Sequence, residues 1–560
     1  MAKFKNLSLC FLVLILSIST AYAAEPDRIL SNSEAWSDVY STILYGNLLG
    51  KPASFLVSDK HATLILNSIP AQSHIWAISS KKVPYVVGYK NILESKGYSA
   101  EEFVFDNVNL ELAKRLDGVT SFIIIDDSYG YNAIAAAPYA SVTKSYVLFA
   151  DSSNIGDVED FLDSKKPTKL IIFGNVDREV KSSLSKFNPE IINKEGDRFL
   201  NNIEITKKYQ EIRHSKQAIL TNGEFIEQEI MSGTEPVIFI GTNNVPDSIR
   251  DYVKGSDIEV GVLIGNELVG TATFIRRQMG ISVFVKFAQG ARNPQGAISQ
   301  VEALDMYYLP TYNLNLEIMS VKYNRATNKL EVTLKNTEPQ AVYAVGTYSL
   351  TAADGTKITV GDVGANFIDA NEVKTFTYDA QELPEGGISA DIFIIYGESQ
   401  GSLEKEIRKT IDVESVRILD ECEIQVNSVS YNKRNKNFYV DVENTGKVDC
   451  FVDLEIVDLV IAGAKTTVGL DTVAEIASGS KKSLRIKVED MEEDDLTDNT
   501  QVKIRAYYGE RENTLVRVIE GIFDLALKST DYMFYVLLIV IVLLLFIIVW
   551  KRRKKKEEKK

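Results

Sequence analysis

Four polar residues in the first third of the chain are the candidates for contacting a ligand or a cation. Asp126 and Asp127 follow one apolar run, and Asn175 and Asp177 follow another. Side chains at the end of a buried strand are held rigidly at an exposed sheet edge, where carboxylate and amide oxygens can bind Ca²⁺ or a sugar hydroxyl. Consecutive strand residues point to opposite faces, so capping a helix near Tyr129 is the alternative role for the two aspartates.

The histidines of the sequence stand in none of the motifs of several common enzyme classes. Its three histidines, His61, His74 and His214, form no HExxH or paired spacing and stand in no G-x-S-x-G context, and neither GxGxxG nor GxxxxGK[ST] is present. These absences argue against a His- or Cys-rich metal site, a nucleotide site and a surface hydrolase. We therefore expect no enzymatic activity and no cofactor, with calcium bound by carboxylates left open.

The charge distribution argues against nucleic acid as a partner. The chain has 560 residues, 45% of them hydrophobic, with 62 Lys plus Arg against 77 Asp plus Glu and a formal net charge of -15. Residues 551–560 carry eight basic and two acidic side chains, so the charge of the rest is more negative still. Such a surface disfavours binding to polyanions.

The N-terminus has the pattern of a secretory signal. Two lysines precede an apolar run over 7–18, and residues 21–23 read Ala-Tyr-Ala. This pattern predicts a signal peptide over 1–23 that is cleaved after Ala23. A retained membrane anchor is the alternative.

The other end carries a longer hydrophobic segment. Residues 532–550 are uncharged and would span about 28 Å as a helix. Aromatic residues at both of its ends and the basic residues after it predict a transmembrane helix over 531–550 with a cytoplasmic tail over 551–560. We therefore expect a single-pass protein of the cell membrane, with its N-terminal ectodomain outside and its C-terminus in the cytoplasm.

Two cysteines, Cys422 and Cys450, remain once Cys10 leaves with the signal peptide. Thiols oxidise outside the cell, so we expect a disulfide between them. Closing a loop of about 29 residues corresponds to roughly 3 to 4 kcal/mol of stabilisation in the chain-entropy model. Two reduced, buried thiols are the alternative, which requires a reducing compartment.

Between residues 34 and 290, short apolar runs alternate with helical patterns. The runs are PASFLV (52–57), VPYVV (83–87), SFIIID (121–126), SYVLF (145–149), KLIIF (169–173), PVIFI (236–240) and EVGVLI (259–264). Continuous apolar strands predict parallel sheets covered on both faces by helices. Helical patterns over 38–50 and 131–143 each precede a run, and 168–180 resembles 236–249, where Asp177 and Asp247 are expected to open helices.

The segment from Ser121 to Tyr209 resembles the type 2 cell-wall-binding repeat of bacterial and archaeal surface proteins. The resemblance rests on NAIAAAPYA (132–140), YVLF (146–149), PTKLIIFGN (167–175) and GDRF (196–199). Asn132 and Asn175 stand where the family has Asp and Gly. In this family three repeats pack around a pseudo-threefold axis and tether the protein to a wall polymer. The resemblance implies an α/β head over 24–310, with units at about 27–118, 119–211 and 212–300.

After Pro310 the sequence alternates apolar and polar residues. The segments 320–337 and 428–445 align without gaps, which predicts two tandem β-sandwiches over 311–413 and 414–527. They resemble the immunoglobulin-like stalk domains of archaeal surface proteins. Sandwiches joined end to end without a flexible linker are expected to form a semi-rigid rod.

The predicted fold class is therefore multidomain: an α/β head with parallel sheets, two all-β immunoglobulin-like sandwiches and one transmembrane helix. These features predict a membrane-anchored, surface-layer-like structural protein of the envelope, whose head self-associates or binds other envelope proteins. The alternative is a membrane-anchored receptor or adhesin for surface glycans or peptides. In that case Tyr129, Tyr131 and Tyr139 are expected to line a cleft.

Overall fold

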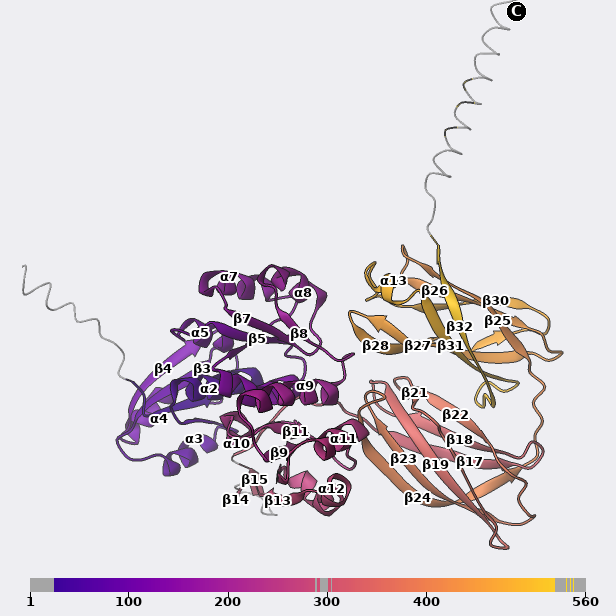
Figure 1. The fold of residues 1–560 in the computed structure, drawn as a ribbon, viewed down its shortest axis with the longest axis horizontal. Coiled ribbons are helices and arrows are strands. Elements are labelled where there is room, and N and C mark those ends of the chain that lie inside the picture. Colours follow the sequence, from indigo (N-terminus) through magenta and orange to yellow (C-terminus); the bar gives the residue numbers. More distant parts are fainter. Residues whose placement is uncertain are drawn as a thin grey trace, which may run out of the picture.

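The computed structural model describes residues 25–287, 290–292, 301–303 and 305–528, together with Val540, Leu544 and Ile547. Figure 1 shows an α/β body built from the first half of the chain and two β-domains built from the second half. We call them the head (25–309), the first sandwich (314–418) and the second sandwich (420–528). The predicted signal peptide over 1–23 lies outside the described residues.

The head contains three four-stranded parallel sheets, and in each the second strand lies at one edge, followed by the first, third and fourth. Their strands are β1 (Arg28–Asn32), β2 (Ala53–Phe55), β3 (His74–Ser80) and β4 (Ser99–Phe105); β5 (Ser121–Ile125), β6 (Tyr146–Phe149), β7 (Lys169–Phe173) and β8 (Glu190–Ile192); and β9 (Gln217–Thr221), β11 (Val237–Phe239), β12 (Val260–Ile264) and β13 (Ser282–Lys286). The central strands are apolar on both faces, as the fully buried Ile123 and Ile124 of β5 show. Helices therefore cover both sides of each sheet.

Three helices meet at the centre of the head. α2 (Trp36–Leu49), α6 (Tyr131–Thr143) and α10 (Gln228–Ser232) each lie between the first and second strand of a sheet, and each contacts the other two. Asn47 Nδ2 and Ser141 Oγ both donate to the carbonyl of Met231, over 2.7 and 2.9 Å. The three units thus share one helical centre.

The remaining elements of the head are short. The helices are α3 (His61–Leu64), η1 (Ile65–Ser68), α4 (Tyr89–Ser95), α5 (Val108–Lys114), α7 (Ile155–Lys165), α8 (Arg178–Leu184), η2 (Ser185–Phe187), α9 (Arg198–Ile212), α11 (Asp247–Gly255), η3 (Asn266–Thr271) and α12 (Ala272–Met279). The strands are β10 (Phe225–Ile226), which pairs with β16 (Tyr307–Tyr308), and β14 (Gly290–Arg292), which pairs with β15 (Val301–Ala303).

Two buried asparagines connect successive units. Asn109 of α5 and Asn202 of α9 each donate to a backbone carbonyl and accept from a backbone amide on the second strand of the next sheet. These backbone partners are Val147 and Phe149 of β6 for Asn109, and Val237 and Phe239 of β11 for Asn202. Each side-chain amide therefore satisfies backbone groups at a sheet edge that no strand of the described residues covers.

Both sandwiches are curled eight-stranded sheets with the same strand order. The first consists of β17 (Leu316–Asn324), β18 (Lys329–Asn336), β19 (Val342–Ala352), β20 (Lys357–Gly361), β21 (Asn366–Ile368), β22 (Val373–Asp379), β23 (Ile388–Gly397) and β24 (Leu403–Val416). The second consists of β25 (Ile424–Asn432), β26 (Asn437–Asn444), β27 (Cys450–Ile461), β28 (Ala464–Gly469), β29 (Ala474–Ile476), β30 (Lys481–Lys487), β31 (Gln501–Gly509) and β32 (Arg517–Lys528), with the short α13 (Asp495–Asp498). Strands one, two and six lie on one side and the others on the opposite side, as in immunoglobulin-type sandwiches.

The gapless alignment of the two sandwiches corresponds to equivalent structure. A register shift falls between Ile318 and Ser320 in one and between Val426 and Ser428 in the other. The buried asparagines that end the second strands, Asn336 and Asn444, also have the same partners, because each donates to the carbonyls of the following loop and of the fifth strand. Those carbonyls belong to Gln340 and Ile368, and to Val448 and Ile476.

Two predictions for the head are wrong. VPYVV (83–87) forms no strand; instead Val86 N donates to Asn32 Oδ1 over 3.0 Å, in a loop beside β1. The segments 168–180 and 236–249 are not equivalent, because β7 is the third strand of its sheet and β11 is the second of its own. The topological counterpart of β7 is β12.

The predicted fold class is wrong in its last element. Among the residues that the structure describes, no helix has both the length and the apolar character needed to cross a bilayer. Apart from Val540, Leu544 and Ile547, the predicted transmembrane helix over 531–550 and tail over 551–560 lie outside those residues. The finding contradicts the single-pass location in the cell membrane. The described fold is an α/β head followed by two curled β-sheets.

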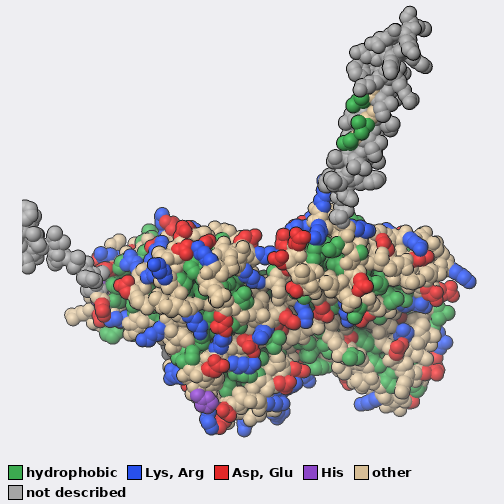
Figure 2. All heavy atoms as spheres, turned by 45° about the horizontal axis from the view of Figure 1, so that its top comes forward, with side chains coloured by type: hydrophobic (Ala, Val, Ile, Leu, Met, Phe, Trp, Pro, Cys, Tyr) green, Lys and Arg blue, Asp and Glu red, His purple; other side chains and the backbone are tan. Residues whose placement is uncertain are grey.

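The expected end-to-end rod is also wrong. The two sandwiches lie side by side, and both adjoin the head (Figure 1). Lys181 of the head donates to the Ala462 carbonyl of the second sandwich, and Tyr343 of the first sandwich donates to Thr467 of the second. Figure 2 shows acidic and basic side chains interspersed over the visible face of all three bodies. Each of the three bodies therefore contacts the other two.

Candidate functional site

The predicted ligand residues lie at the carboxyl edge of the second sheet. Because β6, β5 and β7 are neighbouring parallel strands, the loops that follow them share this edge. Asp126 Oδ1 accepts from Ser128 N over 2.8 Å, and Asp177 Oδ2 accepts from Ser152 N over 2.7 Å. Both carboxylates thus fix loops; Asp177 precedes α8 without capping it through its side chain.

A further carboxylate, Asp151, lies at this edge after β6, and the sequence pattern does not single it out. Burial, followed by repulsion from Asp126 and Asp151, raises the pKa of Asp127. Burial also disfavours the charge on Asp151, but hydrogen bonds from Ser153 and Asn154 hold its pKa below the usual value. The loop after β5 is therefore linked electrostatically to the loop after β6, which a hydrogen bond connects to Asp177 after β7.

Asn175 is exposed, and its neighbour Gly174 makes a close contact. Gly174 has a φ of +79°, and a Cβ atom there would collide with the side chain of Asn132. Asn132, one departure from the resembled family, therefore packs against the residue that precedes Asn175, the other departure. Over the described ranges, no group of three His, Cys, Asp or Glu residues is arranged to hold a metal ion. A ligand or cation at Asp126, Asp127, Asn175 and Asp177 stays a prediction.

The most elaborate polar site of the structure is the junction between the head and the first sandwich. Arg198, the first residue of α9, is 4% exposed. Its Nη2 lies 2.5 Å from Glu404 Oε2 and its Nε lies 3.0 Å from Glu398 Oε1. The guanidinium carbon also lies 3.8 Å from the centre of the Tyr131 ring and 5.6 Å from that of Tyr312. One cation is thus enclosed by two carboxylates and two aromatic rings.

The backbone around this ion pair comes from separate parts of the chain. Asp197 caps α9 by accepting from Phe199 N, and its other oxygen accepts from Ser399 Oγ of the first sandwich over 3.0 Å. The amides of Asn243 and Asn244, after β11, donate to the Glu404 carbonyl over 3.1 and 3.0 Å. The β23–β24 hairpin is therefore held by two loops of the head.

Burial shifts the acid–base behaviour of this junction. It raises the pKa of Glu398 to about 8, although the positive charge of Arg198 opposes the rise. Burial alone would lower the pKa of Arg198, but Glu398 and Glu404 raise it. Arg198 is therefore charged at any physiological pH, and Glu398 changes charge close to neutrality.

Two of the tyrosines expected to line a ligand cleft, Tyr129 and Tyr131, belong to this junction instead. Tyr131 and Tyr312 stack with ring centres 5.5 Å apart, and Tyr129 lies 4.2 Å from Tyr312. Tyr129 OH also accepts from Gln340 of the first sandwich over 2.6 Å, while Tyr139 is buried and accepts from Lys169 Nζ. The rings of Tyr129 and Tyr131 thus pack between the head and the first sandwich, and Tyr139 packs within the head.

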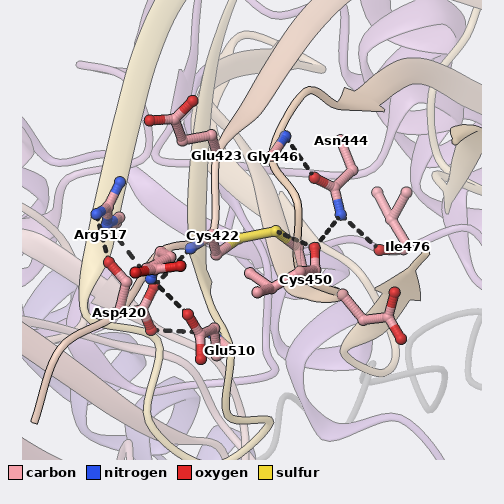
Figure 3. The surroundings of a disulfide bond; sticks show 12 residues. Asp420, Cys422, Glu423, Asn444, Gly446, Cys450, Ile476, Glu510 and Arg517 are labelled. Carbon is pink, nitrogen blue, oxygen red and sulfur yellow. Dashed lines mark hydrogen bonds and ion pairs between the residues drawn. A yellow bond between two sulfur atoms is a disulfide. The ribbon is translucent and has the colours of Figure 1, made fainter. Parts of the chain in front are cut away.

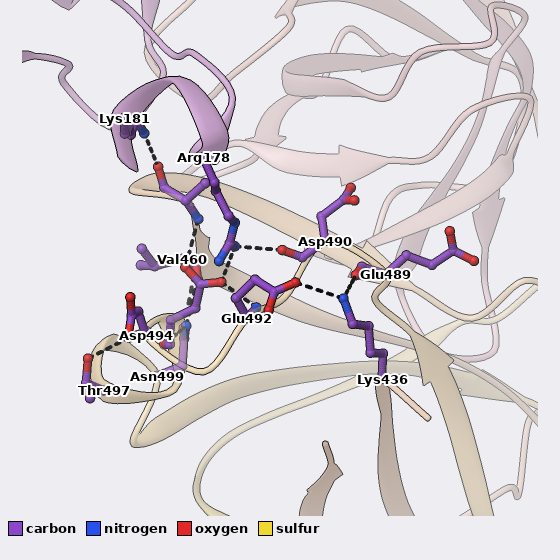
Figure 4. A network of polar contacts seen from close by, with 12 residues as sticks. Arg178, Lys181, Lys436, Val460, Glu489, Asp490, Glu492, Asp494, Thr497 and Asn499 are labelled. Carbon is purple, nitrogen blue, oxygen red and sulfur yellow. Dashed lines mark hydrogen bonds and ion pairs between the residues drawn. The ribbon is translucent and has the colours of Figure 1, made fainter. Parts of the chain in front are cut away.

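The second sandwich contacts the head through α8. Figure 4 shows Arg178 and Lys181 pointing from α8 towards loops of the sandwich. Arg178 pairs with Asp495 and donates to the Asp490 carbonyl over 2.6 Å, and Lys181 donates to the Ala462 carbonyl over 2.7 Å. These contacts are more exposed than the Arg198 cluster.

The two sandwiches meet at a second buried cation. Lys374 Nζ lies 2.8 Å from Glu455 Oε2 and 3.5 Å from Glu372 Oε1, and only 5% of its side chain is exposed. Arg505 reaches the other oxygen of Glu455 at 3.1 Å. Burial would lower the pKa of Lys374, but Glu455 and then Glu372 raise it. Each interface of the first sandwich thus contains a buried ion-pair cluster.

The predicted disulfide is confirmed. Cys422 and Cys450 are bonded, with Cα atoms 5.5 Å apart and both residues fully buried. Cys450 opens β27, whereas Cys422 lies before β25, at the start of the second sandwich and just after the linker from the first. Figure 3 shows Asp420 and Arg517 on the linker side of the bond and Asn444 on the other.

A pocket of about 810 Å³ lies between the first and third sheets. Arg28, from the Asp-Arg pair at the start of the first unit, contributes to its wall and donates to Ser54 Oγ over 3.1 Å. Lys286 on the same wall pairs with Glu227 over 2.7 Å. In the part of the chain that the structure describes, no carboxylate lies within ion-pair distance of Arg28, and burial lowers its pKa. The guanidinium is available to a carboxylate or hydroxyl-rich ligand.

One serine–histidine contact has a composition that a hydrolase could use. Ser99 Oγ lies 2.9 Å from His74 Nδ1, across β4 and β3. Glu101 Oε1 lies 3.9 Å from His74 Nε2, too far for a hydrogen bond that would orient the ring. This geometry gives the hydrolase alternative no support.

No protein-family model matches the chain, and no curated protein matches it. Among solved structures, it is similar to Cwp8 from Clostridium difficile with 17% identity and a TM-score of 0.38, over 46% of this chain and 48% of that one. The periplasmic chaperone SfaE matches with 10% identity and a TM-score of 0.14, over 39% of this chain and all of that one. Escherichia coli alpha-2-macroglobulin activated by porcine elastase matches with 11% identity and a TM-score of 0.14, over 42% and 24%. The chain thus spans about half of Cwp8, and these similarities give the archaeal attribution no support.

Proposed function

We propose that the chain is a non-enzymatic structural protein of the cell envelope, surface-layer-like, whose head self-associates or binds other envelope proteins. The observation that supports this most is the Arg198–Glu398–Glu404 cluster, which joins the head to the first sandwich. A shifted packing of the two bodies would keep Arg198 buried without its acidic partners, so the cluster favours one fixed orientation. A subunit that repeats in a regular assembly requires such an orientation. The Cys422–Cys450 disulfide supports an oxidising compartment.

The proposal is tested by the association state of the purified full chain. Sedimentation velocity and negative-stain electron microscopy over a range of concentrations should detect oligomers or sheets. Ca²⁺ should promote them, because the cation screens repulsion between acidic surfaces. The variant Glu404→Gln should assemble poorly, whereas Glu94→Gln, at an exposed ion pair with Lys90, should behave as the native chain does. A native chain that stays monomeric at every concentration, with and without calcium, contradicts the proposal.

A second candidate function, binding of a surface glycan or peptide, is supported by the pocket beside Arg28. Its wall combines the half-buried guanidinium with the apolar Phe55 and Ile65, a combination typical of sites for polar ligands with an apolar face. A panel of glycans and peptides should then contain members that raise the melting temperature of the native chain. The rise should vanish in Arg28→Gln and persist in Arg115→Gln, because Arg115 instead lies over the Phe103 ring. If no panel member raises the melting temperature, this function is wrong.

A further inference from the structure

The two sandwiches provide an internal comparison at the disulfide. Their gapless alignment places Leu314 and Val342 of the first sandwich at the positions of Cys422 and Cys450. The strand registers agree, because Val342 and Cys450 each pair with the last residue of the fifth strand. Leu314 and Val342 are 3% and 0% exposed and belong to one apolar core. The same fold therefore forms around two apolar side chains without a covalent bond.

The linker between the sandwiches is fixed by side-chain contacts on both sides of one residue, Leu419. Towards the first sandwich, the buried Asn324 donates to the Ile418 carbonyl over 2.8 Å and accepts from its amide over 3.2 Å. Towards the second, the Asp420 carboxylate lies 3.7 Å from Arg517, which also donates to the Asp420 carbonyl. Leu419, which is 67% exposed, is the residue between these anchors. The hinge between the sandwiches is therefore very short.

The disulfide lies next to the second anchor, the contacts of Asp420 with Arg517, and adds a covalent bond to it. Cys422 follows Asp420 by two residues, and its bond to Cys450 ties the linker to the first residue of β27. The contact between the second sandwich and the head includes an exposed ion pair. Lys465 and Glu195, which form it, have 46% and 57% of their side chains exposed. Exposed ion pairs contribute little each. The contact with the head therefore depends on the angle at which the linker and the buried Lys374–Glu455 pair between the sandwiches present the second sandwich.

We propose that the Cys422–Cys450 disulfide is a lock on the orientation of the second sandwich and is dispensable for its fold. A dithiol opens the lock: it transfers two electrons and two protons to the disulfide and closes into its own ring disulfide, leaving two cysteine thiols. The linker then gains freedom beyond Asp420, and the second sandwich separates from α8 while its β-sheet stays intact. The inference goes beyond the proposed function, because it concerns regulation of shape in one chain.

The test replaces the disulfide by the residues of the first sandwich, Cys422→Leu together with Cys450→Val, in the full chain. Hydrogen exchange followed by mass spectrometry then reports on two regions. The amide of Lys465 donates to the Glu195 carbonyl of the head, and its exchange should become at least tenfold faster. Amides in β26, which pairs with β25 and β30 inside the second sandwich, should exchange within twofold of their native rates. Dithiothreitol added to the native chain should produce the same pattern.

A destabilised control separates the lock from general stability. Val440 is fully buried in β26, so Val440→Ala should accelerate exchange in β26 without a selective effect at Lys465. Faster exchange at Lys465 and in β26 together in the double variant would show that the disulfide supports the fold, and would overturn the proposal. An unchanged rate at Lys465 in the double variant, or in the reduced native chain, would overturn it too.

Discussion

Arg198 and Glu404 form an ion pair across the boundary between the head and the first sandwich, with Nη2 and Oε2 2.5 Å apart and 5% and 3% of the two side chains exposed. The two residues lie 206 positions apart in the chain. Their pairing is strong evidence that the head and the sandwich fold against each other, because two isolated charges would not be buried at such a cost.

Removal of one partner of this ion pair should therefore strongly lower the free energy of unfolding. We predict that Glu404→Gln lowers the free energy of unfolding by about 3 kcal/mol, since it removes one of the two acidic partners of the buried Arg198. Denaturant titration of the full chain measures the loss. Glu94→Gln should cost about 0.5 kcal/mol or less, because Lys90 and Glu94 are 45% and 49% exposed. Equal losses of unfolding free energy in Glu404→Gln and Glu94→Gln would contradict the claim that the buried junction stabilises the chain.

Glu398 should make stability depend on pH. Its pKa is raised by burial from an ordinary value of 4.5 to about 8, so the folded chain keeps a proton that the unfolded chain releases. The contribution of Glu398 to stability is therefore complete below pH 4.5 and declines up to pH 8, by at most about 1.4 kcal/mol per pH unit. Unfolding measured between pH 5 and 8 should show a shallower decline for Glu398→Gln than for the native chain. Parallel curves would show that Glu398 does not titrate as described.

The asparagines between the units of the head should contribute more to the free energy of unfolding than their polarity indicates. Asn109→Ala and Asn202→Ala each leave a buried strand amide and carbonyl without their side-chain partner, and we predict a loss of about 2 kcal/mol for each. Asn175→Ala, at an exposed position, should change the free energy of unfolding by less than about 0.5 kcal/mol. A small loss at Asn109 and Asn202 would mean that the sheet edges are satisfied without them.

Local sequence patterns predicted local structure well. The helical patterns over 38–50 and 131–143 correspond to α2 and α6, and the gapless repeat corresponds to hairpins with register shifts at the same place. VPYVV (83–87) failed because apolar composition alone does not distinguish a strand from a loop that packs against one. β3 (HIWAISS) was missed because histidine and serine interrupt its apolar pattern.

Contacts between the bodies could not be predicted in the same way. Arg198 belongs to the GDRF segment that carries the family resemblance, but its carboxylate partners lie in the hairpin of another domain. Lys374 and Glu455 likewise look like ordinary surface residues of alternating strands until the two sandwiches are placed together. Ion pairs between residues far apart in the chain follow no periodic sequence pattern and could not be predicted. The sequence therefore predicted a rod, whereas in the structure each body contacts the other two.

The central claim, that the three bodies form one rigid unit, is tested most directly by an interdomain distance. Nitroxide labels on Ser164→Cys in the head and Ser483→Cys in the second sandwich, both exposed positions, can be attached while Cys422 and Cys450 stay bonded, and pulsed electron resonance then gives the distribution of their separations. We predict one narrow distribution that Glu404→Gln broadens. A broad or multiple distribution in the otherwise native chain would contradict the account.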